Sequence, residues 1–185
     1  MADFSTIKGF NIPSVATDPV TSQVAGGSWA SGGNVNSDRF ALGSAGLQTA
    51  GLIFGGDTHP ASPRTSDLTE SYDGSTWTEV GDLTTARRAN TGFGIQTAAI
   101  AAGGYTGTTG ASESWNGSSW TAIPSLNTAR YEASGAGLQA AGLVFSGNPR
   151  GGETETWNGS AWTEVADLND ARYDFAVSAP DSTAA

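Results

Sequence analysis

Cysteine is absent from the 185 residues, and histidine and lysine each occur once. Without cysteine there are no disulfides and no thiolate chemistry, although this does not fix the compartment. The single histidine, His59, cannot build a zinc site with cysteine partners or a relay with a second histidine. Apolar runs are also short, since none approaches the ~20 residues of a membrane helix. We therefore expect no metal, no cofactor and no membrane contact.

Positive charge is scarce. Eight Lys and Arg residues stand against 18 Asp and Glu residues, which gives a formal net charge of -10. A protein that binds phosphate backbones needs a cationic face that releases counterions, and an anionic membrane repels an acidic chain. Nucleic acid is accordingly not an expected partner.

Glycine, in contrast, is abundant, with 26 residues in the chain. This is about twice the usual share of ~7%, and together with many Ser and Thr residues it favours short strands joined by many turns. The length suits one domain with one core. The composition therefore predicts an all-β fold without long helices.

The dominant feature is an internal repeat, which changes how every other motif is interpreted. Three segments align without a gap: ESYDGSTWTEVGDLTTAR (70–87), ESWNGSSWTAIPSLNTAR (113–130) and ETWNGSAWTEVADLNDAR (155–172). A degenerate fourth copy is SQVAGGSWASGGNVNSDR (22–39). Each copy has an Arg ten residues after a Trp; these residues are Trp29 and Arg39, Trp77 and Arg87, Trp120 and Arg130, and Trp162 and Arg172.

A second block follows the first three of these Arg residues: GLQTAGLIFGG (46–56), GIQTAAIAAGG (94–104) and GLQAAGLVFSG (137–147). The tryptophans are 48, 43 and 42 residues apart, a period within the range of propeller blades. Asp73-Gly74 and Asn116-Gly117 predict hairpins with type I′ turns, flanked by pairs of aromatic residues. Pieces such as RYEASGAG (130–137) and AGLVF (141–145) are the other two strands, joined by the small Gly-Leu-Gln-Thr/Ala turn. Each period therefore predicts a four-stranded antiparallel unit.

This order of residues resembles the kelch repeat: an Arg, an apolar strand ending in Gly-Gly, a variable loop, Glu-x-Tyr/Trp, a turn and a Trp. In detail, the residues of the repeats and the leader MADFSTIKGF resemble those of kelch-like virion structural proteins of tailed, notably marine, bacteriophages. The resemblance implies a small β-propeller over residues 21–178, preceded by a docking leader (1–20) and followed by a tail (179–185). Kelch propellers usually close with six or seven blades, whereas this chain encodes three whole units.

Two arrangements of a fourth blade remain open. The segments at about 20–31 and 172–178 are complementary fragments, so the two ends of the chain can complete one blade in a closed ring. Alternatively, blades from several copies complete one another, as a symmetric virion with multiple copies per particle allows. We favour the closed ring.

The repeated residues have a functional and a structural interpretation. Four Arg residues at one register can form a site for an acidic or sulfated glycan, and Glu70, Glu113 and Glu155 can be taken for catalytic carboxylates. A residue that recurs in every repeat is better explained by what every repeat needs, such as an Arg forked between carbonyls of adjacent turns. The carboxylates also show none of the asymmetry that a glycosidase pair requires. We therefore predict that the repeated Arg and Trp residues are structural and that no residue is catalytic.

The loops after each Gly-Gly, in which the repeats differ, are where recognition is expected. They cover residues 57–69, 105–112 and 148–154, and the candidate ligand residues on them are His59, Arg64, Tyr105 and Arg150. The longest stretch, 57–67, is the best candidate. The alternative is that these loops are unselected surface turns.

The leader outside the repeat has no helical or alternating pattern. Its apolar residues are too many for a purely solvated tail, so we expect Phe4, Ile7, Phe10 and Ile12 to dock onto another virion protein. The resemblance then implies a non-enzymatic virion structural protein, made in the host cytoplasm and displaying the propeller on a tail fibre or capsid. The alternative is a carbohydrate-binding module that recognises host surface glycans through its variable loops. Oxidase chemistry of the kind known on kelch propellers needs a Cys crosslinked to Tyr, and there is no Cys.

Overall fold

The computed structural model describes residues 31–149 and 151–171, and these form three four-stranded sheets without a helix. The first sheet consists of β1 (Gly43–Leu47), β2 (Ala50–Phe54), β3 (Thr69–Tyr72) and β4 (Trp77–Glu79). The second consists of β5 (Thr91–Ile95), β6 (Ala98–Ala102), β7 (Ser112–Trp115) and β8 (Trp120–Ile123). The third consists of β9 (Ser134–Leu138), β10 (Ala141–Phe145), β11 (Thr154–Trp157) and β12 (Trp162–Val165).

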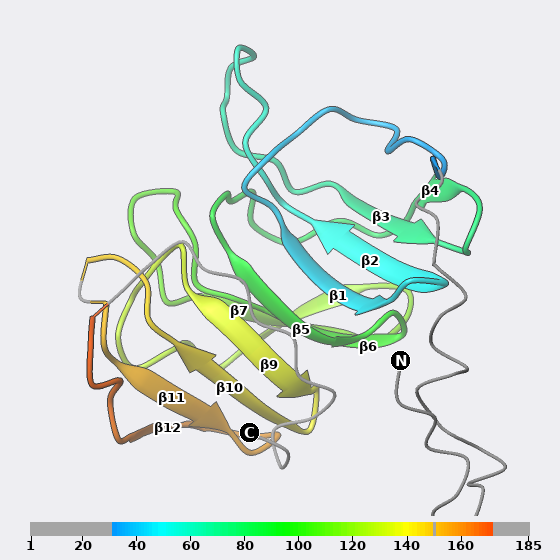
Figure 1. The fold of residues 1–185 in the computed structure, drawn as a ribbon. Helices are drawn as coiled ribbons and strands as arrows, with labels where there is room; N and C mark the ends of the chain where they lie inside the picture. The colour runs from blue at the N-terminus through cyan, green and yellow to red at the C-terminus, as the bar shows by residue number, and fades with distance from the viewer. Residues whose placement is uncertain (1–30, 150, 172–185) are drawn as a thin grey trace, which may run out of the picture. The chain divides into compact units, whose positions relative to one another are not determined.

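Within every sheet the strands follow chain order and pair antiparallel, as Figure 1 shows. The first strand of each sheet ends in the Gly-Leu/Ile-Gln block and the second lies within it. A two-residue connection such as Gln48-Thr49 joins them, between paired Leu47 and Ala50. The last two strands come from the hairpin that carries the aromatic pair, in which Trp115 lies opposite Trp120. This confirms the predicted all-β class and the four-stranded antiparallel unit per period.

The predicted type I′ turn of these hairpins is wrong. Such a turn needs a positive φ at both central residues, whereas here Gly74 has φ 95° and Asp73 is not left-handed. A four-residue loop forms because Asp73 Oδ1 accepts the backbone N–H groups of Ser75 and Thr76, both at 2.8 Å. The backbone N–H of Thr76 and the Ser75 hydroxyl hold the pKa of Asp73 well below its usual range. The side chain, rather than the turn type, defines this connection.

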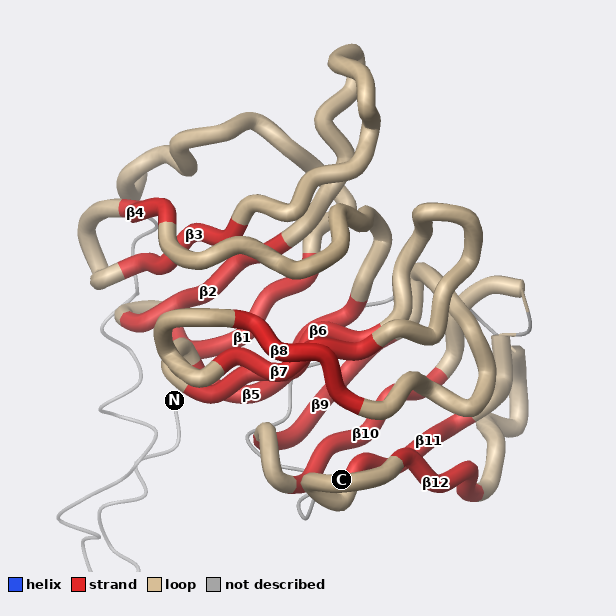
Figure 2. Tube along the Cα trace, turned by 180° about the vertical axis from the view of Figure 1, so that it is seen from behind, coloured by secondary structure: helices blue, strands red, loops and turns tan. Residues whose placement is uncertain are grey.

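Two apolar layers form the core, one between each pair of neighbouring sheets. The first contains Leu52, Phe54, Leu83, Ala99, Ala101, Trp115 and Trp120. The second contains Phe93, Ile100, Ala102, Leu126, Val144, Trp157 and Trp162. Figure 2 shows the sheets from behind, with the middle sheet between the other two. The hairpin tryptophans of the second and third sheets are therefore buried against the preceding sheet.

The same polar contacts join both pairs of sheets. Gln96 Nε2 donates to Tyr72 O at 2.6 Å, and Gln139 Nε2 donates to Trp115 O at 2.5 Å. The indole N–H of Trp115 in turn donates to the backbone carbonyl of Gln96, within the second sheet, at 2.9 Å. The glutamine of the repeat thus fixes the register of one sheet on the next, a role that its place in a short turn did not reveal.

Replacing Gly92 with alanine is expected to lower the free energy of unfolding by about 1–3 kcal/mol, because β1 and β5 lie too close for a side chain. A Cβ on Gly92 would stand 2.5 Å from the carbonyl oxygen of Ser44 in the first sheet. Gly152→Ala is the matched control, since its nearest neighbour is the Leu168 oxygen at 3.9 Å. Urea unfolding of both variants tests this, and equal losses would show that the sheets are not this closely packed.

The three stacked sheets are compatible with a propeller-like fold. The leader (1–20), Trp29, Arg172, the tail (179–185) and the segments expected to complete a fourth blade all lie outside the described residues. The number of blades and the closure of a ring therefore remain predictions.

Candidate functional site

Two of the repeated arginines, Arg87 and Arg130, lie between neighbouring sheets. The backbone N–H of Arg87 donates to Ser66 O in the loop of the first sheet, at 2.9 Å, while its guanidinium donates to Ala111 O beside the second sheet at 2.6 Å. Arg130 repeats this one sheet further on, with its guanidinium 3.3 Å from Ser146 O. Arg39 donates to Leu68 O at 3.2 Å. Arginine supplies this contact because its planar fork reaches several acceptors at once.

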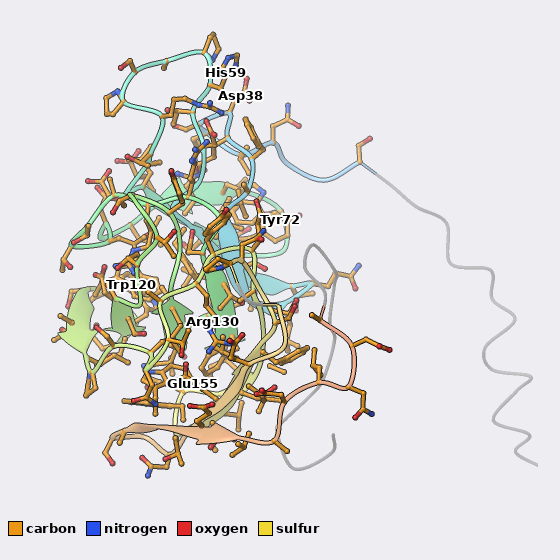
Figure 3. The ribbon with its side chains drawn as sticks, turned by 90° about the vertical axis from the view of Figure 1, so that its left-hand side faces the viewer. Asp38, His59, Tyr72, Trp120, Arg130 and Glu155 are labelled. Carbon is orange, nitrogen blue, oxygen red and sulfur yellow. The ribbon has the colours of Figure 1, made fainter. Side chains whose placement is uncertain are left out.

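Each of these arginines also pairs with the glutamate of the sheet that it reaches. The pairs are Arg39 with Glu70, Arg87 with Glu113, and Arg130 with Glu155, and all six side chains are almost completely buried. Figure 3 shows Arg130 and Glu155 close together, 2.7 Å apart at Nη2 and Oε1. Burial lowers the pKa of Arg87, and attraction to Glu113 opposes this.

The carboxylates are occupied further by backbone N–H groups. Glu113 accepts from Thr84 N at 2.7 Å, and Glu155 accepts from Asn127 N at 2.8 Å. A buried charge needs such pairing to be tolerated. Sequence reasoning attributed these glutamates to the repeat rather than to catalysis, but it did not predict that each pairs with a repeated arginine.

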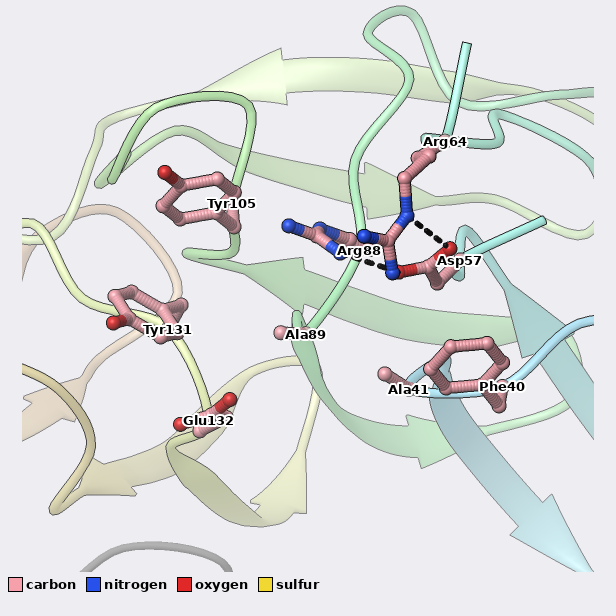
Figure 4. Close-up of a pocket in the computed structure, with 9 residues that line it drawn as sticks. All are labelled: Phe40, Ala41, Asp57, Arg64, Arg88, Ala89, Tyr105, Tyr131 and Glu132. Carbon is pink, nitrogen blue, oxygen red and sulfur yellow. Dashed lines mark hydrogen bonds and ion pairs between the residues drawn. The ribbon is translucent and has the colours of Figure 1, made fainter. Parts of the chain in front are cut away.

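The non-repeated residues gather in a pocket of about 350 Å³ at the end of the sheets where β1, β5 and β9 begin. We call this the end pocket (Figure 4); its walls are Phe40, Ala41, Asp57, Arg64, Arg88, Ala89, Tyr105, Tyr131 and Glu132. Some of these residues directly precede the first strand of a sheet, and others follow the second strand of a sheet.

The backbone explains why these positions converge. Isolated antiparallel bridges join Phe40 to Asp57, Arg88 to Tyr105, and Tyr131 to Asn148. The residue after the first member of each bridge has a left-handed backbone, with φ 50° at Ala41, 51° at Ala89 and 55° at Glu132. These residues link the repeats, because Ala89 N donates to Ala41 O at 2.6 Å and Glu132 N donates to Ala89 O at 2.9 Å. The sheets thereby bring unlike side chains from three repeats around one pocket.

Asp57 is the buried polar centre of the end pocket. Arg64 binds it with two nitrogens, Nε at 3.2 Å and Nη2 at 2.6 Å, and Arg88 Nη1 adds a third bond. Burial disfavours the ionised form, but hydrogen bonds from Arg64, Arg88 and the His59 backbone outweigh it and lower the pKa of Asp57 from 3.8 to about 2. Asp57 therefore stays ionised at neutral pH and fixes both guanidinium groups.

Aromatic rings form the other wall. The Arg88 guanidinium carbon lies 5.0 Å from the centre of the Tyr105 ring, and Tyr105 meets Tyr131 edge to face at 5.2 Å. Phe40 is 55% exposed. At the far side Glu132 Oε2 accepts Asn148 Nδ2 at 2.6 Å. The pocket thus offers guanidinium donors, aromatic surface and, besides the buried Asp57, the carboxylate of Glu132.

Of the four predicted ligand residues, the structure brings two together. Arg64 and Tyr105 line the end pocket, whereas His59 contributes its backbone N–H to Asp57 and Arg150 lies outside the described residues. Sequence reasoning missed Asp57, Arg88 and Tyr131 as lining residues. A signal was available for Arg88 and Tyr131, because the residue directly after Arg39, Arg87 and Arg130 differs: Phe40, Arg88 and Tyr131.

Acid is expected to remove the stability that ionised Asp57 contributes. Its folded pKa lies below the usual value, so the contribution is complete above about pH 4 and disappears as the pH falls toward the folded pKa of about 2. We predict that Asp57→Asn destabilises the protein at pH 6 and that the difference from wild type shrinks between pH 4 and pH 2. Urea unfolding at several pH values measures this, and a difference that does not change with pH would contradict it.

Within residues 31–149 and 151–171 no group of three or more His, Asp or Glu side chains is arranged to hold a metal ion. The same residues include no helix long and apolar enough to cross a membrane. A comparison with models of known protein families and with curated proteins finds no match to this chain.

Proposed function

We propose that this chain is a non-enzymatic structural protein of a bacteriophage virion, which displays a kelch-like propeller on the surface of the particle. The observation that carries the proposal is the layout of the sequence, in which a short leader precedes repeats whose residues resemble those of kelch-like virion proteins. Three stacked sheets suit a display scaffold. Docking is assigned to Phe4, Ile7, Phe10 and Ile12, which lie outside the described residues.

The non-enzymatic assignment is supported by the state of the repeated carboxylates. Glu70, Glu113 and Glu155 are buried and each is paired with an arginine. A glycosidase needs one protonated and one free carboxylate beside the substrate. Glu113 and Glu155 instead hold the contact between neighbouring sheets, and Glu70 binds Arg39 and Asn36 of the segment before β1.

Assembly with particles tests the virion proposal. We expect the full chain to be recovered with purified particles of a phage that carries this gene, and a version lacking residues 1–20 to be lost from them. Recovery of the shortened version would disprove docking through the leader. Absence of both versions from the particles would disprove the structural role.

A second function, carbohydrate recognition on the host surface, is favoured by the end pocket. Arg64 and Tyr105 come from two different variable loops and converge there with further aromatic and charged groups. Concave sites with aromatic walls and a few fixed polar groups are typical of ligand binding. Binding to a glycan array that disappears when the 57–67 loop is shortened supports this function, and the absence of binding to any glycan refutes it.

A further inference from the structure

The polar side of the end pocket carries an excess of positive charge. Asp57 is 1% exposed, and both of its oxygens are occupied by Arg64 and Arg88. Two guanidinium groups thus share one carboxylate, which leaves one positive charge of this cluster uncompensated. Glu132 is the other acidic lining residue, and its hydrogen bond from the neutral Asn148 does not offset its charge. It lies across the pocket from Arg64 and Asp57 (Figure 4), so the positive excess is local to the Asp57 cluster.

Arg88 is placed to use that charge on a ligand. Its bond to Asp57 uses Nη1, and no other hydrogen bond of its side chain is made among residues 31–149 and 151–171. Its side chain is 26% exposed and is held over the Tyr105 ring. A guanidinium has five N–H donors in a fixed fork, so Nε and Nη2 can bind a carboxylate through two parallel bonds.

Arg64 stands at the rim of the same cluster. Its side chain is 49% exposed, and Nε and Nη2 hold Asp57 while Nη1 points to no protein acceptor among the described residues. It adds a second, weaker donor for the same anion.

The rest of the end pocket suits the ring of a sugar. Tyr105, Tyr131 and Phe40 supply apolar ring surface, and the tyrosine hydroxyls and Glu132 supply partners for hydroxyl groups. The volume of about 350 Å³ lies at the lower end of the range for small-ligand pockets, which suits a single sugar unit. The net charge of -10 disfavours a long polyanion, although repulsion from distant charges is screened beyond ~8 Å in physiological salt.

We propose that the end pocket binds a single carboxylate-bearing sugar unit, with its carboxylate on Arg88 and Arg64 and its ring against Tyr105. This rests on the carbohydrate-recognition function proposed above and specifies its ligand class. Neutral sugars lack a partner for the uncompensated guanidinium charge, and simple anions leave the aromatic wall unused.

An NMR titration of the full chain tests the ligand class with three probes: methyl α-D-galactopyranosiduronic acid, methyl α-D-galactopyranoside and acetate. The acidic glycoside is expected to bind at least about tenfold more tightly than either other probe, as a charge-assisted bidentate contact allows. Equal binding of the two glycosides overturns the acidic-sugar inference but leaves carbohydrate recognition intact. Equal binding of acetate and the acidic glycoside overturns a role for the sugar ring. If neither glycoside binds, the acidic-sugar inference is overturned, and the glycan array decides whether the protein recognises carbohydrate at all.

Variants separate the contacts. Arg88→Gln is expected to reduce affinity for the acidic glycoside about tenfold or more, and Arg88→Lys, which keeps the charge but loses the fork, is expected to restore part of it. Tyr105→Ala is expected to weaken both glycosides and to leave acetate unchanged. Amide spectra of each variant report whether it is folded. If Arg88→Gln is unfolded, the rim variant Arg64→Gln takes its place, with an expected loss of affinity for the acidic glycoside of about threefold. Full affinity in a folded Arg88 or Arg64 variant contradicts the proposal.

Discussion

Replacing Glu113 with leucine is expected to lower the free energy of unfolding by about 3–5 kcal/mol, because it leaves the Arg87 guanidinium buried without an anion. Both side chains are 1% exposed, and Glu113 also accepts the backbone N–H of Thr84. The substitution removes both interactions at the contact between the first and second sheets. Chemical denaturation followed by tryptophan fluorescence measures the loss.

The double variant Arg87→Met with Glu113→Leu is the control. Removing both charges removes the uncompensated ion, so it should be clearly more stable than Glu113→Leu alone. Arg64→Ala is the exposed comparison, because its ion pair with Asp57 involves a half-exposed arginine. A loss for Glu113→Leu no larger than that for Arg64→Ala would contradict a structural role for the repeated pair.

Replacing Trp120 with alanine is expected to cost a similar amount, about 3–5 kcal/mol, because the indole joins two sheets. Its ring meets Phe54 of the first sheet edge to face at 4.7 Å, and Nε1 donates to Thr69 Oγ1 at 3.0 Å. The substitution leaves a cavity in the first core layer and an unpaired buried hydroxyl acceptor. Thermal and urea unfolding report the effect.

Trp77 is the matched control, since it occupies the same register in the first sheet. Its ring packs against Tyr72 of its own sheet at 4.9 Å and remains half-buried. Trp77→Ala should therefore cost clearly less than Trp120→Ala. Equal costs would mean that packing within the hairpin, rather than packing between sheets, gives the repeated tryptophan its importance.

The sequence was sufficient to predict the all-β class and the four-stranded unit, because a repeated pattern of Gly, aromatic and apolar residues constrains every period in the same way. It did not predict the turn at Asp73, where side-chain hydrogen bonds replaced the expected backbone turn. Nor did it reveal Gln96 as a contact between sheets. Both depend on geometry that spacing along the chain does not carry.

The candidate site was harder to predict than the fold. Arg64 and Tyr105 were selected because they lie on variable loops, and both line the end pocket. Asp57 and Arg88 come from different repeats, 31 residues apart, and are brought together only by the contact between the first two sheets. Long-range pairing of unlike residues leaves no periodic signal in the sequence.

The repeated residues hold the sheets together, and we propose that the non-repeated residues at one end of the sheets carry recognition. A map of amide chemical-shift changes during titration with methyl α-D-galactopyranosiduronic acid tests this division most directly. We predict changes around Phe40, Asp57, Arg88, Tyr105 and Glu132, and none at the hairpins that carry Trp77, Trp120 and Trp162. Changes centred on those hairpins, with the end pocket unaffected, would contradict it.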